Sequence, residues 1–150
     1  MPIVREVHGD LLTSNANLLG CTVNIMGVMG AGVAKAFADR YPDLFYHYAR
    51  LCRQRKFNLD HIAVFRPAGA SHSVVMIPTK DHWQNPSDLG QVQACLVNLS
   101  DYLKTDGRHW HTVALPPLGC GNGGLDYESQ VRPLMYRYFE DVPCQVEVWL

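Results

Sequence analysis

Hydrophobic and polar positions follow two periods along this chain, and these periods predict its elements. Short apolar runs, of the length typical of buried strands, are separated by longer segments with apolar residues at helical spacing. We expect strands at about residues 3–7, 18–25, 61–65, 73–78, 112–116 and 145–149. Strands that alternate with helices are typical of an α/β layered fold, in which a sheet lies between helices.

The most regular helical pattern begins with an N-cap at Ser87 and ends at Gly107. Apolar residues recur at every third or fourth position between them, which predicts one buried face: Leu89, Val92, Leu96, Leu99 and Leu103. Another helix is expected at about residues 130–140. Two more are expected at 31–40 and 43–56.

The composition is that of an ordinary globular protein. The chain has 150 residues, of which 47% are hydrophobic and 18% are charged, so a packed core is expected and intrinsic disorder is excluded. This length fits one core, and we expect a single domain over residues 1–150. The formal charge of −1 lacks the excess of basic residues found in a dedicated nucleic-acid binder, so any contact with nucleic acid has to be local.

The cysteines and the N-terminus indicate the compartment. Five cysteines are spread along the chain without a C-x-x-C pair, which favours free thiols in a reducing environment. The first ten residues show no apolar run preceded by positive charge, and no stretch approaches about 18 uninterrupted apolar residues. We therefore expect a cytoplasmic, monomeric protein with no signal peptide and no membrane span.

A glycine-rich turn, residues 24–32, follows the second expected strand and opens a helix; we call it the first glycine loop. Its glycines, Gly27, Gly30 and Gly32, allow a phosphate to approach backbone N–H groups at a helix N-terminus. The spacing G-x-x-G-x-G is neither the dinucleotide-binding fingerprint nor a P-loop. The turn is therefore either an anion-binding loop or simply a tight connection.

The second glycine loop, residues 119–124, follows the strand expected at 112–116 and contains four glycines in six positions. Each glycine costs backbone entropy on folding, so we expect these glycines to serve a positive φ or the close approach of a ligand. A branched residue at Gly123 is expected to block that ligand and leave the fold intact. Two neutral N–H loops at strand ends suit a diphosphate bound without metal.

A lysine, Lys80, follows the strand expected at 73–78 and stands beside Asp81, His82 and Trp83. A lysine at the binding edge of a sheet can act as a cation or, with a lowered pKa, as an amine nucleophile toward a sugar. The alternative is a solvated surface charge.

Two aspartates stand in turns after strands, Asp10 in His8-Gly-Asp and Asp126 after the second glycine loop. Each is either a turn residue that binds its own backbone or a ligand contact, Asp10 as an acceptor for an exocyclic amine and Asp126 as an acid–base group. His109 and His111 lack the partners of a metal site, and we interpret them as structural. No metal ligand is predicted.

The order of these motifs resembles the macrodomain, the α/β/α module that binds ADP-ribose. The matching segments are Gly9-Asp10, Asn24 before GVMGAGVA, and the late PPLGCGNGGLDY, so the resemblance covers nearly the entire chain. Three motifs are most similar to the branch that includes the DarG antitoxin and the terminal ADP-ribose glycohydrolase of animals: MGAG, PTKDHW and GCGNGGLD. The Asn-Ala-Ala-Asn signature of other macrodomain hydrolases is absent. The resemblance implies three α/β/α layers around a mixed six-stranded sheet.

The resemblance also implies roles for residues. Asp10 and the backbone of Leu11 would hold adenine, and the two glycine loops would wrap the diphosphate and distal ribose, with Asn24 near that ribose. Lys80 matches the branch's catalytic lysine, whose amine is thought to meet the anomeric carbon of that ribose, and Asp126 matches the acid that assists release of the lysyl intermediate. The implied ligand-binding set is Asp10, Leu11, Asn24, Gly27, Val28, Met29, Gly30, Ala31, Gly32, Gly119, Cys120, Gly121, Asn122, Gly123, Gly124, Leu125 and Trp149.

The function implied by the resemblance is an ADP-ribosyl glycohydrolase that uses no metal and no cofactor. ADP-ribosylated thymidine in single-stranded DNA is the favoured target, and a cognate ADP-ribosyltransferase toxin is a further candidate partner. The alternatives are a reader of ADP-ribose without turnover, an enzyme acting on ADP-ribosylated Asp or Glu side chains, and a phosphatase for ADP-ribose 1″-phosphate. Residues 50–56 hold a basic cluster, Arg50, Arg53, Arg55 and Lys56, that either meets phosphates or is a solvated helix face.

Overall fold

One six-stranded sheet organises residues 3–106 and 110–150, which are the residues described by this computed structural model. The strands are β1 (Val4–Val7), β2 (Leu18–Val23), β3 (Ala63–Phe65), β4 (Ser73–Pro78), β5 (Thr112–Leu115) and β6 (Gln145–Trp149). Their order is β1-β6-β5-β2-β4-β3, with every pair parallel except β3 and β4. The expected mixed sheet is confirmed.

Successive residues of each strand enter two separate cores, because side chains alternate between the faces of a sheet. Leu18 packs in one core and Leu19 in the other. In β4, Val75 and Ile77 join the core of Leu18, and Met76 joins that of Leu19. All five side chains are fully buried, which explains why the central strands read as continuous apolar runs.

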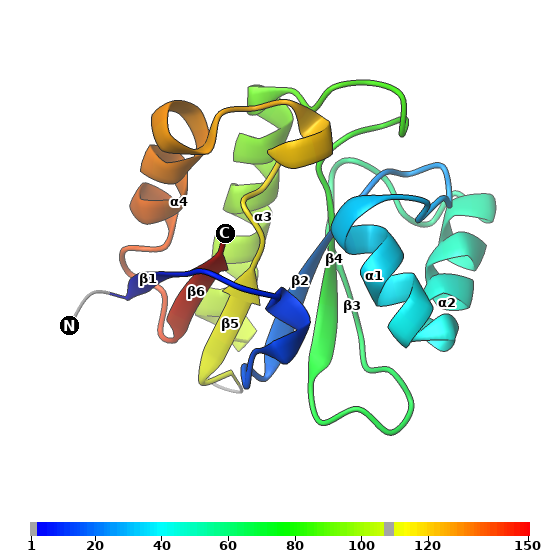
Figure 1. The fold of residues 1–150 in the computed structure, drawn as a ribbon, viewed down its shortest axis with the longest axis horizontal. Coiled ribbons are helices and arrows are strands. Elements are labelled where there is room, and N and C mark those ends of the chain that lie inside the picture. The colour runs from blue at the N-terminus through cyan, green and yellow to red at the C-terminus, as the bar shows by residue number, and fades with distance from the viewer. Residues whose placement is uncertain (1–2, 107–109) are drawn as a thin grey trace.

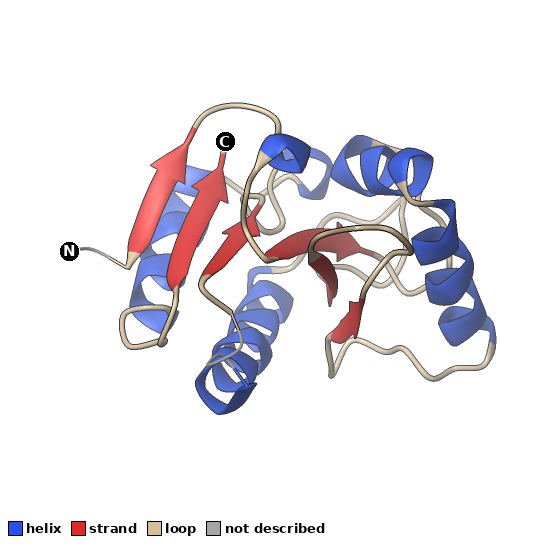
Figure 2. Cartoon of the chain, turned by 90° about the horizontal axis from the view of Figure 1, so that it is seen from below, coloured by secondary structure: helices blue, strands red, loops and turns tan. Residues whose placement is uncertain are grey.

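Four helices cover the two faces, and the expected three-layer arrangement is confirmed (Figures 1 and 2). They are α1 (Gly32–Arg40), α2 (Pro42–Arg53), α3 (Leu89–Asp106) and α4 (Arg132–Tyr138). Apolar residues of α1 and α2 fill one core, and those of α3 and α4 fill the other. Within the described ranges, no helix is both long enough and apolar enough to cross a membrane.

The boundaries differ from the sequence prediction at a few ends. The N-cap predicted at Ser87 is wrong by one position, because Asp88 accepts the N–H of Gln91 at 3.2 Å and Leu89 is the first helical residue. The predicted end at Gly107 lies outside the described residues. The helix expected at 43–56 ends at Arg53, and Arg55 adopts a positive φ of 55°.

Further along, the strand expected to reach residue 25 ends at Val23, where the first glycine loop begins. The helix expected at 130–140 begins with a π-helical turn, η4 (Tyr127–Val131).

The parallel strands have a consequence for function. The carboxyl ends of β1, β6, β5, β2 and β4 meet at one edge of the sheet, where ligands of open α/β sheets bind.

Candidate functional site

The three segments that the sequence singled out lie side by side at this edge. Strands β5, β2 and β4 are neighbours. The second glycine loop follows β5, the first glycine loop follows β2, and Lys80 follows β4. Motifs that are far apart in the sequence therefore border one another in the fold, as Figure 1 shows for the elements that carry them.

Hydrogen bonds tie residues 79–88, which we call the lysine segment, to both glycine loops. The N–H of Ile25 donates to the carbonyl of Asp81 at 3.3 Å, which joins the segment to the first loop. The N–H of Ser87 donates to the carbonyl of Gly123 at 2.9 Å, which joins it to the second. The lysine segment thus spans the interval between the two loops.

The glycine loops also approach each other directly. A Cβ added to Gly32 would lie 3.1 Å from Nδ2 of Asn122. The start of α1 and the tip of the second loop are therefore in contact range, with backbone rather than side chain on the α1 side.

A buried amide, Asn24, supports the first glycine loop from within. Its Nδ2 donates to the carbonyl of Val28 at 2.9 Å, and its Oδ1 accepts the N–H of Met26 at 2.9 Å. The hydroxyl of Tyr48, on α2, also donates to that Oδ1, at 2.7 Å. Asn24 is 6% exposed, so the structure places its side chain in support of the loop. Contact of Asn24 with a ribose stays a prediction.

The second glycine loop needs glycine for its backbone conformation at three positions. Gly119, Gly121 and Gly124 have φ values of 76°, 65° and 82°, a region that side chains with a Cβ rarely adopt. At Gly121 and Gly124, an added Cβ would meet nothing within 4 Å. Both residues are exposed, so this loop offers bare backbone to solvent.

At Gly123, packing rather than backbone conformation requires glycine, which differs from the expectation. Its φ lies outside the left-handed region, and its missing Cβ points inward, 2.5 Å from the Oγ of Ser87. The Cβ of a larger residue at this position would therefore meet Ser87, and contact of Gly123 with a ligand stays a prediction. The Ser87 hydroxyl is buried and has no hydrogen-bond partner within the described part of the chain.

The side chain of Lys80 bonds within the lysine segment itself. Its Nζ donates to the carbonyl of Trp83 at 3.2 Å, and no carboxylate pairs with it in the described ranges. Asp81 is occupied by Asn85 and by the N–H of His82, which lower the pKa of its carboxyl. Lys80 therefore forms no ion pair in the described ranges, and its contact with a ligand stays a prediction.

Asp126 is an ionised turn residue with one oxygen to spare. Its Oδ2 accepts from the hydroxyl and the N–H of Ser129, and this cap starts η4. The Ser129 hydroxyl, followed by its N–H, lowers the pKa of the Asp126 carboxyl. No described group donates to Oδ1. Asp126 is therefore a carboxylate near neutral pH, and its Oδ1 can accept a hydrogen bond from a ligand.

The opposite end of the edge combines Asp10 with an indole. Asp10 accepts the N–H of Leu12 through Oδ1, at 3.0 Å. A Cβ on Gly9, whose φ is 145°, would lie 3.3 Å from the ring of Trp149. Trp149 in turn donates from Nε1 to Glu147 at 2.9 Å. The glycine before Asp10 thus lets the turn after β1 lie against the last residue of β6.

Glu147 fixes this end of the site. It also accepts from Ser14 at 2.8 Å and from Arg5 at 2.7 Å. Burial alone would raise the pKa of Glu147, but the hydrogen bonds from Trp149, Ser14 and Arg5 outweigh it and the pKa falls below its ordinary value. The carboxylate therefore stays charged and holds the Trp149 ring in place.

Other reactive groups near the site are unsuited to catalysis. Burial, with a contribution from the Asp126 charge, raises the pKa of Cys120 to about 11, so this thiol is neutral near pH 7 and a poor nucleophile. His111 directly precedes β5 and so lies at the opposite end of the sheet from the site, and His109 lies outside the described residues. Across residues 3–106 and 110–150, no three His, Cys, Asp or Glu side chains are grouped as a metal site requires.

Sequence reasoning missed three supporting residues: Tyr48, the Ser87 hydroxyl, and Glu147. Tyr48 stands on a different element from the Asn24 it binds, so no local motif contains the pair. Glu147 could have been found, because it is a charged residue between the buried Val146 and Val148 of a strand, and half-buried charges are usually paired.

The comparisons with known proteins agree with this geometry. Residues 21–133 match the family model described as Macro domain. A relative from Mycobacterium tuberculosis called "DNA ADP-ribosyl glycohydrolase" is 37% identical over 138 residues, which cover 90% of this chain and 38% of the relative. The chain thus spans about two fifths of that relative's length.

Solved structures are similarly close. The structure called "Macrodomain of Mycobacterium tuberculosis DarG" superposes with a TM-score of 0.90 at 32% identity, covering 97% of this chain and 96% of the other. The structure called "Thermosipho africanus DarTG in complex with ADP-ribose" gives 0.89 at 27% identity, covering 98% of this chain and 41% of the other.

Proposed function

We propose that this chain, which belongs to the macro domain family, is a metal-independent glycohydrolase that removes ADP-ribose from thymidine in single-stranded DNA. One observation carries the proposal: the segment that contains Lys80 is hydrogen-bonded to both glycine loops, through Ile25 and through Ser87. A sugar held between the loops would therefore lie beside a lysine. A pure reader of ADP-ribose has no need for such a group.

The two ends of the edge suit the two ends of ADP-ribose. Backbone N–H groups of the glycine loops are dipoles that can stabilise a diphosphate in place of a cation. At the other end, no described group donates to Oδ2 of Asp10, which can accept from the exocyclic amine of adenine. The Trp149 ring beside Gly9 offers an apolar surface to the base.

Lys80 and Asp126 would supply the chemistry at C1″ of the distal ribose. In the first step the Nζ–C1″ bond forms, the bond from C1″ to thymine breaks, and thymine takes the electron pair and a proton released from Nζ. In the second step water adds at C1″, the Nζ–C1″ bond breaks, and ADP-ribose leaves. The Asp126 carboxylate is ionised, so it can carry the proton between these groups as a general base.

DNA is the proposed target because two lines of support agree. The M. tuberculosis relative carries the name "DNA ADP-ribosyl glycohydrolase". The basic cluster at the end of α2 is the kind of local charge that phosphates require. A cognate ADP-ribosyltransferase is the proposed source of the modified DNA, in keeping with a Thermosipho africanus relative called "DNA ADP-ribosyl transferase-DNA ADP-ribosyl glycohydrolase fusion protein".

The test offers the protein three substrates in chelator: single-stranded DNA ADP-ribosylated on thymidine, a protein ADP-ribosylated on Asp or Glu, and ADP-ribose 1″-phosphate. We expect free ADP-ribose from the DNA. Release from the protein alone would move the target to acidic side chains, inorganic phosphate from the third substrate would indicate a phosphatase, and binding without any product would indicate a reader.

Lys80→Ala separates catalysis from binding. We expect turnover to fall by about 10²–10⁴-fold, with ADP-ribose affinity by calorimetry and thermal stability close to wild type. Lys80→Arg is the matched control, since it keeps the charge and removes the nucleophilic amine. Full turnover in Lys80→Ala would overturn the catalytic role, and full turnover in Lys80→Arg would replace covalent attack by charge stabilisation.

A further inference from the structure

A hollow of about 420 Å³ lies between α2 and the edge strand β3, outside the site described above. Its lining consists of side chains from one face of α2 together with one ring from β3: Asp43, Tyr46, His47, Arg50, Arg53 and Phe65. We call the Tyr46, His47, Arg50, Arg53 and Phe65 side chains the basic–aromatic surface. The α2 residues recur at helical spacing, so a ligand could contact all of them at once.

The rings of this surface are arranged for stacking. His47 and Phe65 are stacked, with ring centroids 4.5 Å apart and an angle of 21° between planes. Burial, followed by the charge of Arg50, lowers the pKa of His47, which favours a neutral ring. Tyr46 is 70% exposed. An exposed aromatic ring beside basic side chains is the arrangement on which unpaired bases stack.

The basic side chains here lack acidic partners. Arg50 and Arg53, and the following Arg55 and Lys56, are exposed and form no ion pair within the described residues. Arg5, Lys35, Lys104 and Arg132 are each paired with a carboxylate. Of the other described basic side chains, Arg40, Arg66, Lys80 and Arg137 are also unpaired, but residues 50–56 hold four such side chains within seven positions. In a chain of net charge −1, the end of α2 therefore concentrates unpaired positive charge.

The acid in the hollow does not cancel this charge. Asp43 stands at the opposite end of α2, and its two oxygens accept the N–H groups of Leu44 and Ala68 at 3.0 and 2.8 Å.

The surface borders the first glycine loop. A Cβ on Gly27 would lie 3.6 Å from Cβ of Cys52 and 3.7 Å from Cα of Ala49, so the loop packs on the last turns of α2. Met26 and Val28 are 54% and 39% exposed on that loop, and they add apolar contact area. A strand that leaves the site past this loop would meet Arg50 and Arg53 next.

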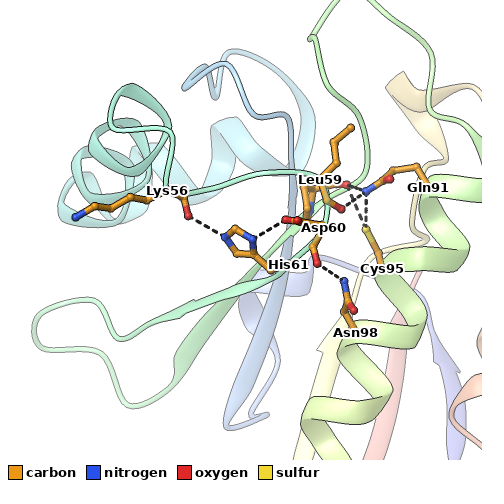
Figure 3. A network of polar contacts seen from close by, with 8 residues as sticks. Lys56, Leu59, Asp60, His61, Gln91, Cys95 and Asn98 are labelled. Atoms are coloured by element: carbon orange, nitrogen blue, oxygen red, sulfur yellow. Dashed lines mark hydrogen bonds and ion pairs between the residues drawn. The ribbon is translucent and has the colours of Figure 1, made fainter.

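Figure 3 shows how the loop after α2 is held in place. A ring nitrogen of His61 contacts the carbonyl of Lys56 at 2.8 Å, and the other contacts Asp60 at 2.9 Å. Asn98 of α3 donates to the carbonyl of Asp60 at 3.0 Å. The backbone that carries Lys56 is therefore linked to α3 through His61 and Asp60.

We propose that the basic–aromatic surface binds the DNA strand that flanks the modified nucleotide, with Arg50 and Arg53 on backbone phosphates and Tyr46 stacked on an unpaired base. This inference rests on the proposed function and adds the path of the strand to it. A single strand is favoured over a duplex because stacking on Tyr46 requires an exposed base face.

The first experiment measures binding of an unmodified oligothymidylate of about 20 nucleotides by fluorescence anisotropy at several salt concentrations. For Arg50→Ala/Arg53→Ala we expect the slope of log K against log salt to fall by about 1.4, since each lost phosphate contact contributes about 0.7. Tyr46→Ala should weaken binding about fivefold or more. Arg137→Ala, an exposed arginine on α4, is the control, and an equal effect there would overturn the proposal.

The second experiment compares turnover of an ADP-ribosylated dinucleotide with that of an ADP-ribosylated oligonucleotide. The double arginine variant should raise KM about tenfold for the long substrate and leave the short one and ADP-ribose affinity within about twofold. An equal rise in KM for the dinucleotide and the oligonucleotide would contradict the proposal that this surface binds the flanking strand. If the wild type cleaves neither, the proposed function fails, and the anisotropy slope still decides about the surface.

A second copy of the chain is the competing occupant. Sedimentation of wild type and of Arg50→Ala/Arg53→Ala tests it, and we expect monomers in both. A dimer that the double variant dissociates would overturn the assignment to DNA.

Discussion

The two glycine loops lie side by side at the same edge and both contain glycines with positive φ, but the first is also held by a buried polar side chain. A polar side chain inside the first loop, Asn24, makes hydrogen bonds to Met26, Val28 and Tyr48. The second loop contains no such group. Its shape depends on backbone angles at Gly119, Gly121 and Gly124 that other residues rarely adopt.

The difference shows that similar glycine patterns can meet different requirements. In the first loop, Gly27 and Gly32 also have positive φ, 85° and 60°, and the buried amide of Asn24 adds hydrogen bonds that support this backbone. In the second, the glycines are themselves the determinant, some through φ and Gly123 through packing. Substitutions should therefore fail for different reasons in the two loops.

Gly119 should be the most sensitive position of the second loop. A Cβ there would lie 2.7 Å from Val92 and 2.8 Å from Leu125, and φ is positive. Gly119→Ala should cost about 3 kcal/mol of unfolding free energy, from strain and overpacking, as measured by urea denaturation. Gly121→Ala, which meets open space at a similar φ, should cost only about 1–2 kcal/mol. Equal costs would contradict the distinction.

Asn24→Ala should destabilise the first glycine loop, because it removes the side chain that hydrogen-bonds to the loop backbone. It leaves the N–H of Met26 and the carbonyl of Val28 without their partner, and we expect a loss of about 2–3 kcal/mol together with weaker ADP-ribose binding. The exposed Asn58→Ala is the control. A variant that loses affinity at unchanged stability would show that Asn24 contacts the ligand instead.

A double-mutant cycle tests the packing of Gly123 on Ser87. Gly123→Ala should cost about 1–2 kcal/mol, because its Cβ would lie 2.5 Å from the Ser87 Oγ. Ser87→Ala removes that oxygen and should be nearly neutral alone, since the hydroxyl has no described partner. The double variant should recover part of the loss. If the two losses of unfolding free energy were simply additive, the Cβ at position 123 would not contact Ser87, and the sequence-based prediction that it faces the ligand would be favoured.

The smallest effect concerns Asp126, beside the second loop. Ser129→Ala removes the main cause of its lowered pKa, so a carboxyl titration followed by NMR should shift toward the ordinary value. Because the pKa of Asp126 is lowered in the folded protein, its ionised carboxylate stabilises the fold at pH values above the ordinary carboxyl pKa. This stabilisation is lost as the pH falls through the pKa of the folded protein. Turnover should therefore change at acid pH and stay constant at pH 7. Asp81, held by Asn85, should not shift.

Much of the fold could be predicted from the sequence, because buried strands and amphipathic helices carry strong local periodicities. The strand at 73–78 is reproduced to the residue. The N-cap of α3 could not be placed, since Ser87 and Asp88 are both good caps. The choice depends on contact between Ser87 and Gly123, which are distant in the sequence.

The site likewise contains residues that could be predicted from local sequence and residues that could not. The glycine loops, Lys80 and Asp126 have local signals, and topology brings the strands they follow to one edge. The support of Asn24 by Tyr48 and of Trp149 by Glu147 arises only from packing between elements. Roles of individual residues toward ADP-ribose stay predictions until the substitutions are measured.

The pairing of β1 with β6 has a consequence for synthesis on the ribosome. It joins residues as far apart as Arg5 and Glu147, 142 positions along the chain. The glycine loops follow β2 and β5, and Lys80 follows β4. All three strands are translated before β6, whereas Trp149 cannot reach Gly9 until β6 has emerged. The end of the site that holds Asp10 is therefore assembled after the glycine loops and Lys80 have been synthesised.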